Sequence, residues 1–391
     1  MFSVRTAWTL EMNRLSSLLA EHRRTGRPLL DLTESNPTSC SLAYPAAEIL
    51  ESLADPAALA YEPDPCGIRS AREAVAGDYV GRGAAVGASD LVLTASTSEA
   101  YSFLFRVLAD PGDRILVPAP SYPLFDLLAR LNDVTGVDYP LRPDLDYAID
   151  FDALGRAAAA GARAVLLVSP GNPTGAYLKQ AERERLVQLC LEHGMALVCD
   201  EVFGDYPFGE DAARVATMAG EPRVLTFVLN GVSKMLALPQ LKLAWIAASG
   251  PEPQKREAMR RLEMVADTFL SVGAPVQHAL PRLLKLRGRL QAPVRGRVAS
   301  NRAWLDTQLE GGRACASRRA EGGWSAVLDV PRTRSEEEWA LRLLEADAVL
   351  VHPGYFFDFP GEGRLVVSLL PAEETFRTGV ARLLKRVEAE A

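Results

Sequence analysis

The sequence predicts an α/β protein with a doubly wound large domain and a smaller α+β domain. Between residues 91 and 229, short apolar segments alternate with helical segments, which is the pattern of parallel strands connected by helices. The segment 164–168 is apolar throughout, as expected for a strand that is buried on both faces. After residue 248 the pattern changes to helices rich in Arg and Leu, and strands are predicted again only over 324–330 and 364–370. This change indicates the smaller domain.

Composition excludes several classes of protein. The chain has 391 residues and is 48% hydrophobic, which is enough for a large and a small domain with a sizeable core. Its net charge of −7 argues against nucleic acid or an anionic membrane as a partner. The five cysteines form no CxxC pair, which indicates a reducing compartment. The N-terminus has no apolar run typical of a signal peptide or membrane span, so we expect a cytoplasmic protein.

The first ninety residues are predicted to supply an arm and part of the small domain before the main sheet begins. An amphipathic helix is expected within residues 1–28, a short strand over 29–33, and helices over 45–53 and 70–80. Tyr61 lies in a loop that two prolines and a glycine make rigid. Its side chain is either ordinary packing or a phenol held toward a ligand, and the local sequence leaves both interpretations open.

Three hydroxyl residues, Ser96, Thr97 and Ser98, follow the strand predicted over 91–94 and open a helix that runs to residue 107. A hydroxyl at the start of a helix caps N–H groups that have no partner within the helix. The same position binds anions, because the free N–H groups and the helix dipole point outward. Three successive hydroxyls exceed what a cap requires, which favours a phosphate site.

Three more strands lead to polar or aromatic side chains. Tyr122 follows the strand over 113–117 and lies between prolines, where a ring can stack on a ligand. Asn172 follows 164–168 and is either a turn residue or an amide placed at the end of a strand. Asp200 ends the strand that begins at residue 196, and an acid is costly to bury there unless it is paired.

Lys234 is predicted to stand on a short turn between two buried strands, over 224–229 and 241–248. Partial desolvation there lowers the pKa of an ammonium group and frees its lone pair, as Schiff-base chemistry requires. The alternative is a lysine on a surface hairpin. The chain has only six lysines and many arginines, so a lysine at this position favours the chemical interpretation.

These side chains all follow the carboxyl ends of predicted strands, which is where doubly wound sheets bind ligands. Together they meet the requirements of pyridoxal phosphate. The lysine forms a Schiff base and acts as the base for the α-proton, and the acid keeps a pyridine nitrogen protonated. The amide bonds a phenolate oxygen, the aromatic ring stacks, and the hydroxyls hold phosphate.

Because these motifs occur together and in this order along the sequence, the chain resembles the class I/II, fold-type I aminotransferases over nearly its whole length. The resemblance implies a large domain with a mixed, mostly parallel sheet sandwiched by helices and a smaller α+β domain. The implied limits are 1–45 for the arm and part of the small domain, 46–270 for the large domain and 271–391 for the small domain. The supporting segments are Tyr61…Gly67…Arg69, 94–100, 118–123, Asn172-Pro-Thr-Gly, Asp200-Glu-Val-Phe, Ser233-Lys234 with Lys242, and Pro353-Gly354.

The resemblance also implies roles for individual residues. Lys234, Asp200 and Tyr122 would be catalytic. Tyr61 would reach the phosphate in the neighbouring subunit, which implies a homodimer, and Ser35 would lie near the substrate carboxylate. No metal is implied. The implied cofactor-binding residues are Tyr61, Ser96, Thr97, Ser98, Tyr122, Asn172, Asp200, Phe203, Ser233, Lys234 and Lys242.

The chain departs from the family at four positions. Phe203 stands where the family usually has tyrosine, Gly231 where it has serine, and Lys242 where it has arginine. The fourth departure concerns the arginine that grips the substrate carboxylate, which the family places near Val366. Arg364 shares the face of Val366 on a strand, so we hypothesise that Arg364 takes over; the alternative is that Arg364 is a solvated edge residue.

The predicted function is transfer of an amino group from an amino acid to a 2-oxo acid through a Lys234 Schiff base. One alternative keeps pyridoxal phosphate but performs β-elimination or acts on an unusual amine, because the cofactor does the electronic work and the pocket selects the bond. Another is the aminotransferase-like half of a transcriptional regulator, which carries a basic DNA-binding domain in front. Only roughly thirty residues precede the predicted fold and the net charge is negative, which argues against that alternative.

Overall fold

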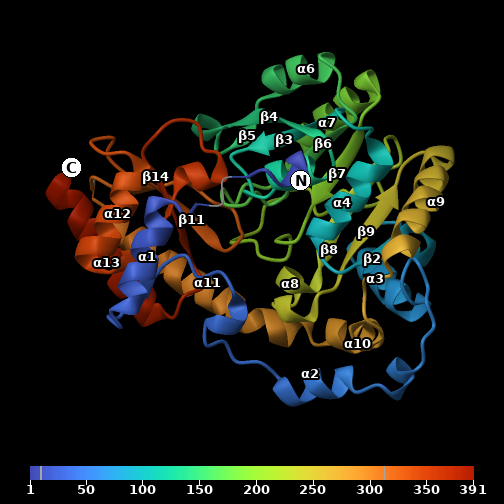
Figure 1. The fold of residues 1–391 in the computed structure, drawn as a ribbon, viewed down its shortest axis with the longest axis horizontal. Coiled ribbons are helices and arrows are strands. Elements are labelled where there is room, and N and C mark those ends of the chain that lie inside the picture. Colours follow the sequence, from blue (N-terminus) through green and yellow to red (C-terminus); the bar gives the residue numbers. More distant parts are fainter. Residues whose placement is uncertain (9–10, 312) are drawn as a thin grey trace.

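A mixed sheet of eight strands forms the centre of the larger domain (Figure 1). The computed structural model describes residues 1–8, 11–311 and 313–391. The strand order is β2-β9-β8-β7-β6-β3-β4-β5, in which β8, β7, β6, β3 and β4 run parallel while β9 and β5 are antiparallel to their neighbours. The strands are β2 (Leu91–Thr94), β3 (Arg114–Ala119), β4 (Thr135–Arg142), β5 (Ala148–Ile149), β6 (Ala164–Val168), β7 (Ala196–Asp200), β8 (Thr226–Gly231) and β9 (Ala244–Ser249).

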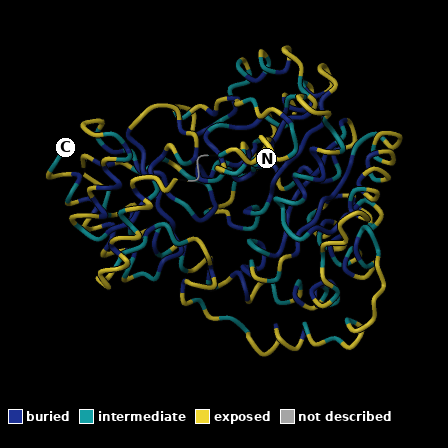
Figure 2. The backbone as a smooth tube through the Cα atoms, in the orientation of Figure 1, coloured by how far each residue is buried: buried dark blue, intermediate teal, exposed yellow. Residues whose placement is uncertain are grey.

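Helices cover both faces of this sheet, as the uniformly apolar strands predicted. Along β6, Val165 and Leu167 join one hydrophobic cluster, and Ala164 and Leu166 join the other. The alternation follows from the two-residue repeat of a strand. The first face packs against α3 (Arg69–Gly81), α6 (Phe151–Ala159), α7 (Gln180–His193) and α10 (Ala274–Lys285), and the second against α4 (Thr97–Leu108), α5 (Phe125–Leu131) and α9 (Glu252–Phe269). Figure 2 shows the strands buried between helices whose outer surfaces are exposed.

The smaller domain is built on an antiparallel sheet of order β10-β11-β14-β13, at the left in Figure 1. A parallel pair, β1 (Leu30–Asp31) with β12 (Val349–Leu350), joins the N-terminal segment to this domain. The other strands are β10 (Ala316–Ser317), β11 (Ser325–Asp329), β13 (His352–Pro353) and β14 (Arg364–Ser368). The helices are α1 (Arg14–Arg24), α12 (Glu336–Asp347) and α13 (Glu373–Glu390).

The long helix α11 (Arg287–Leu309) connects the two domains. Its Leu290 packs in the cluster of the large domain, whereas Val294 and Leu305 pack in the cluster of the small domain. The preceding α10 packs against α3 and against α2 (Ala46–Leu53), so its contacts lie with the large domain. The domain limits 1–45, 46–270 and 271–391 remain a prediction. We propose that the boundary between the hydrophobic cores of the two domains lies within α11.

The structure corrects three local predictions. Lys234 stands in a one-turn helix, α8 (Val232–Met235), rather than on a turn. The strand predicted from residue 241 begins only at Ala244, because Lys242 has φ of 51°, a left-handed conformation that no strand residue adopts. Strand β4 was not predicted, because Gly136 and Pro140 interrupt its pattern and most of its side chains are partly or fully exposed.

No helix in the described parts of the chain combines the length and the apolar character that a membrane crossing requires.

Candidate active site

A cavity of about 450 Å³ opens at the carboxyl ends of the parallel strands and is closed on its other side by residues of the small domain. Strands that run parallel end at the same edge of a sheet, so side chains far apart in sequence meet there. The cavity brings together eleven of the thirteen candidate side chains. These are Ser35, Ser96, Thr97, Ser98, Tyr122, Asn172, Asp200, Phe203, Ser233, Lys234 and Lys242.

Lys234 faces this cavity from α8. Its Nζ lies 5.2 Å from the ring centroid of Trp324 and 5.6 Å from that of Phe203. Desolvation lowers the pKa of Lys234, and the charge of Asp200 opposes part of this shift. The amine is therefore more readily available as a nucleophile or base than an exposed lysine.

Helix α8 is a single turn, and three side chains from other elements bind two of its carbonyl groups and that of Ala237 just after it. The Tyr206 hydroxyl donates to the Lys234 carbonyl at 2.7 Å. Gln291 of α11 donates to the Met235 carbonyl at 2.8 Å, and the Tyr44 hydroxyl donates to the Ala237 carbonyl at 2.8 Å. Carbonyls at a helix end have no partner within the helix, so these contacts fix the backbone that carries Lys234.

Asp200 ends β7 and is buried at the floor of the cavity. Burial raises the pKa of Asp200 to about 6. The Val202 backbone N–H donates to its Oδ1 at 3.0 Å, the Tyr101 hydroxyl donates to its Oδ2 at 3.0 Å, and both contacts favour the charged form, as does Lys234. A cationic group bound in the cavity would favour it further.

The N-terminus of α4 has more hydroxyl groups than its cap uses. Ser96 accepts the Glu99 backbone N–H at 3.1 Å, and the Glu99 carboxylate in turn accepts the Ala95 N–H at 2.7 Å. Within the described residues, the hydroxyls of Thr97 and Ser98 form no hydrogen bond. With Ser233 and Lys242 they surround a site that suits a phosphate, since hydroxyls, free N–H groups and a cation converge on it.

Tyr122 and Phe203 provide aromatic surfaces to the cavity. Tyr122 is 38% exposed and meets Phe125 edge-on at 6.2 Å between ring centroids, which leaves ring surface open toward the cavity. Phe203 meets Trp324 edge-on at 5.2 Å. Asn172 lines the same cavity with its amide and, within the described residues, forms no side-chain hydrogen bond.

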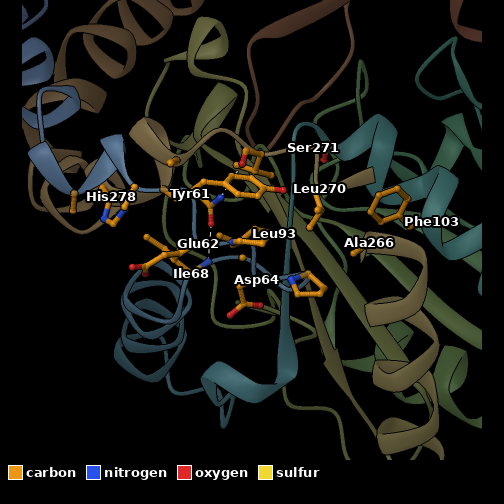
Figure 3. Close-up of a pocket in the computed structure, with 18 residues that line it drawn as sticks. Tyr61, Glu62, Asp64, Ile68, Leu93, Phe103, Ala266, Leu270, Ser271 and His278 are labelled. Carbon is orange, nitrogen blue, oxygen red and sulfur yellow. Dashed lines mark hydrogen bonds between the residues drawn. The ribbon is translucent and has the colours of Figure 1, made fainter. Parts of the chain in front are cut away.

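Two candidate residues lie outside the cavity. Tyr61 is 82% exposed and borders a separate small hollow, where Figure 3 shows it with Leu270, Ser271 and His278. Arg364 is buried: its Nη1 donates to the Pro360 carbonyl at 2.8 Å, and it does not contribute to the cavity lining.

Tyr101, Trp324 and His352 are among the residues of the site that sequence reasoning missed. Tyr101 follows the hydroxyl cluster by one helical turn, and this spacing could have placed it on the inner face of α4. Trp324 and His352 come from the small domain, and nothing in their local sequence predicts that they reach Lys234 or the cavity. No cluster of three or more His, Cys, Asp or Glu side chains in the described ranges is arranged to hold a metal ion.

The chain is similar to known aminotransferases over most of its length. It is 25% identical over 368 residues to the glutamate-pyruvate aminotransferase AlaA of Escherichia coli, covering 92% of this chain and 90% of that protein. It is 27% identical over 374 residues to an alanine aminotransferase of Mycobacterium tuberculosis, covering 92% and 85% of the two chains. The solved structure of an alanine aminotransferase from Pyrococcus furiosus has the same fold, with a TM-score of 0.88 at 22% identity and full coverage of both chains.

A solved aspartate aminotransferase of Thermus thermophilus also shares the fold, with a TM-score of 0.85 at 24% identity over 98% of this chain and 99% of that one. The family described as aminotransferase class I and II matches residues 28–382. That match includes Lys234, Asp200 and the loops that surround the cavity. The chain therefore belongs to the class I and II aminotransferases.

Proposed function

We propose that this aminotransferase holds pyridoxal phosphate through Lys234 and uses it to move an amino group from an amino donor to a 2-oxo acid. When bound, the cofactor would supply an aldehyde that forms a Schiff base with an amine, and a ring that draws electrons from the α-carbon of the substrate. The observation that supports this proposal is that one cavity brings together an amine with lowered pKa, a buried acid, and hydroxyl groups with a lysine that suit an anion.

The residues in the cavity fit this cofactor. Asp200 is a buried acid whose charged form lacks full compensation, so it suits a protonated ring nitrogen as a hydrogen-bond donor. Thr97, Ser98 and Lys242 suit the phosphate, and the amide of Asn172 suits a phenolate oxygen as donor. Phe203 carries no hydroxyl for that oxygen, so Asn172 would serve it alone.

Lys234 and Asp200 then divide the work of proton transfer and charge stabilisation. Nζ of Lys234, once a substrate amine has replaced it, is free to take the proton from the α-carbon, and its lowered pKa leaves it neutral more often. Asp200 would favour the protonated form of the cofactor's ring and so would help to stabilise the electron pair that the proton leaves behind. Tyr122 would keep the ring in place by stacking.

We further propose a homodimer in which Tyr61 serves the neighbouring site. In a single chain Tyr61 lies away from the cavity and is largely exposed. Leu59, two residues before it, is 92% exposed, and Phe269 and Leu270 at the end of α9 are also exposed. Of these, Leu270 lines the hollow that Tyr61 borders (Figure 3). A second copy of the chain would cover such a surface.

The cytoplasmic location expected from the sequence is also part of the proposal. All five cysteines are unpaired thiols, and Cys40, Cys190, Cys199 and Cys315 are buried. Burial raises the pKa of Cys190 to about 12, so this thiol is unreactive. Such cysteines suit a reducing compartment.

An absorbance titration tests the cofactor and the reaction together. Purified protein with pyridoxal phosphate is expected to show a yellow band that Lys234→Ala lacks. An amino donor should remove the band, and a 2-oxo acid should restore it. Absence of the band from the wild type would contradict the cofactor assignment, whereas release of pyruvate and ammonia from a cysteine conjugate, with no oxo acid present, would indicate elimination instead.

A further inference from the structure

The acidic, lysine and arginine side chains that line the cavity all come from the large domain. They are Asp200, Lys234 and Lys242. The opposite wall comes from the small domain and the segment before α2, and its described residues bring neither Arg nor Lys to the cavity. Under the proposed function, Lys234 and Lys242 are occupied by the cofactor. A second carboxylate, on a substrate side chain, would then enter a partly buried site whose described lining has no further Arg or Lys to pair with it, which is unfavourable.

The small-domain wall is instead aromatic. Trp324, Phe356 and Phe357 line it, and the imidazole of His352 lies 5.7 Å from the ring centroids of both phenylalanines. Such a wall suits an uncharged ring or a branched apolar group, because flat hydrophobic surfaces pack against it and lose contact with water.

Two neutral hydrogen-bonding groups interrupt this apolar wall. The indole Nε1 of Trp324 is buried and has no hydrogen-bond partner within the described residues, although the Trp324 ring lies 5.2 Å from Nζ of Lys234. The ring nitrogens of His352 likewise form no hydrogen bond there, and burial lowers the pKa of His352, with Asp31 opposing the shift. The Trp324 Nε1 is a buried donor without a partner, so the carboxylate at the α-carbon of a bound amino donor would supply its acceptor, while the half-buried His352 imidazole faces the same cavity.

We propose that this site takes an amino donor with an uncharged, ring-sized apolar side chain, discriminates against donors that carry a second carboxylate, and uses His352 and Trp324 as the residues that set this preference. The inference rests on the proposed function, because it takes Lys234 and Lys242 as cofactor residues. It differs from what the name of the Escherichia coli relative, a glutamate-pyruvate aminotransferase, would suggest.

Binding of unreactive analogues to the yellow holoenzyme tests the preference without relying on turnover. The probes are 3-phenylpropionate, with one carboxylate and a ring, and glutarate, with two carboxylates, and binding is measured by calorimetry and by the change in the cofactor band. We expect 3-phenylpropionate to bind at least about tenfold more tightly, because an unpaired buried charge is costly. Glutarate binding as tightly or more tightly would overturn the proposal.

Variants on the wall identify the residues responsible. His352→Phe keeps a ring and removes the nitrogens, and it should weaken 3-phenylpropionate about tenfold while leaving the cofactor band unchanged. Val366 also lines the cavity, so Val366→Arg should strengthen glutarate binding about tenfold or more, whereas the matched control Val366→Leu should not. Unchanged affinities in both His352→Phe and Val366→Arg would refute the assignment.

Failure of this inference is distinguishable from failure of the proposed function. A protein with a yellow band that Lys234→Ala abolishes, and that glutamate removes faster than phenylalanine does, would retain the function and lose the inference. A protein without the band would lose both.

Discussion

The Tyr101 hydroxyl, on α4, donates a hydrogen bond of 3.0 Å to Oδ2 of Asp200 at the end of β7. Both side chains are buried, so water does not compete for this contact. Asp200 is costly to charge because burial raises its pKa to about 6, and Tyr101 is one of the groups that favour its charged form. The charge that the proposed chemistry requires at Asp200 therefore depends in part on a phenol from a neighbouring helix.

We expect Tyr101→Phe to raise the pKa of Asp200 further. Loss of a donor destabilises the carboxylate relative to the acid, and a hydrogen bond to a charged group contributes about 1.5–3 kcal/mol, equivalent to about one pKa unit or more. The acid limb of the pH profile of kcat/KM should move to higher pH. The control Tyr139→Phe removes a buried phenol that donates to the Leu166 carbonyl, so it should cost stability without moving that limb. If the acid limb does not shift in Tyr101→Phe, Tyr101 does not stabilise the charged form of Asp200.

Glu201 is a second buried acid, next to Asp200, and it predicts a pH dependence of stability. Burial raises the pKa of Glu201 from 4.5 to about 7, against the lowering effect of the Met218 N–H and Thr217 hydroxyl that donate to it at 2.7 Å. The native state therefore binds a proton that the unfolded state has lost between pH 4.5 and 7. Glu201 makes the native state progressively less stable as the pH rises through this range, by about 3 kcal/mol at most.

Glu201→Gln should remove this contribution, because the amide keeps an acceptor for the Met218 N–H and does not ionise. Urea unfolding of the cofactor-free protein at pH 5 and pH 8 measures the effect. Relative to the wild type, the variant should gain stability at pH 8 but not at pH 5, whereas Glu192→Gln at an exposed position should behave like the wild type. Parallel pH dependences for Glu201→Gln and the wild type would refute the assignment.

Local pattern was sufficient for most of the large domain. The segment 164–168 was predicted with the bounds that β6 has, because uniform apolarity is a strong signal over that length. Helix α8 was missed because four residues are too few to show a helical repeat. The helical turn at Lys234 depends on side chains from distant parts of the chain. Tyr206, Gln291 and Tyr44 bind the carbonyl groups of Lys234, Met235 and Ala237, respectively.

Site residues that directly follow a strand could be predicted from the sequence. Site residues that the small domain brings to the cavity by tertiary packing could not. Asp200 and Asn172 each stand at the end of a strand. The rule that ligands bind at such ends was enough to predict that both belong to the site. His352 and Trp324 enter the cavity only because the small-domain sheet packs over it. That packing is set by long-range pairing such as β1 with β12, which a local pattern does not encode.

The close packing of β8 against β9 explains why glycine occupies position 231, where the family usually has serine. Gly231 ends β8, and a Cβ added there would lie 2.8 Å from the Cβ of Ala244 on β9 and 2.9 Å from the carbonyl oxygen of Leu243, the residue before β9. We expect Gly231→Ser to lower the free energy of unfolding by about 1–3 kcal/mol through overpacking, without improving cofactor affinity. Gly209→Ser is the control, since a Cβ at Gly209 meets no atom within 4 Å. A stable Gly231→Ser protein with tighter cofactor binding would show that β9 moves aside.

Variants of Arg364 can distinguish a structural role of this side chain from a role in substrate binding. Its guanidinium lies 5.6 Å from the centroid of the Phe359 ring, and its Nη1 donates to the Pro360 carbonyl. We expect Arg364→Ala to cost about 1–3 kcal/mol in stability, because a buried side chain with its packing and its hydrogen bond is lost, and to leave KM for the best donor within about twofold. Chemical unfolding and steady-state kinetics measure the two effects. A rise in KM of about tenfold with unchanged stability would instead support the carboxylate-binding role hypothesised from the sequence.

The exposed Tyr61 predicts complementation between two inactive variants. If Tyr61 serves the neighbouring subunit, a mixed dimer of Lys234→Ala and Tyr61→Ala contains one site with both residues intact and one with neither. Random exchange makes half of the dimers mixed, so activity without excess cofactor should return to about one quarter of the wild-type value. If Tyr61 serves its own chain, each site in every dimer retains a defect and mixing restores nothing. Light scattering on the same samples establishes whether a dimer forms, and a monomer would refute the proposed assembly directly.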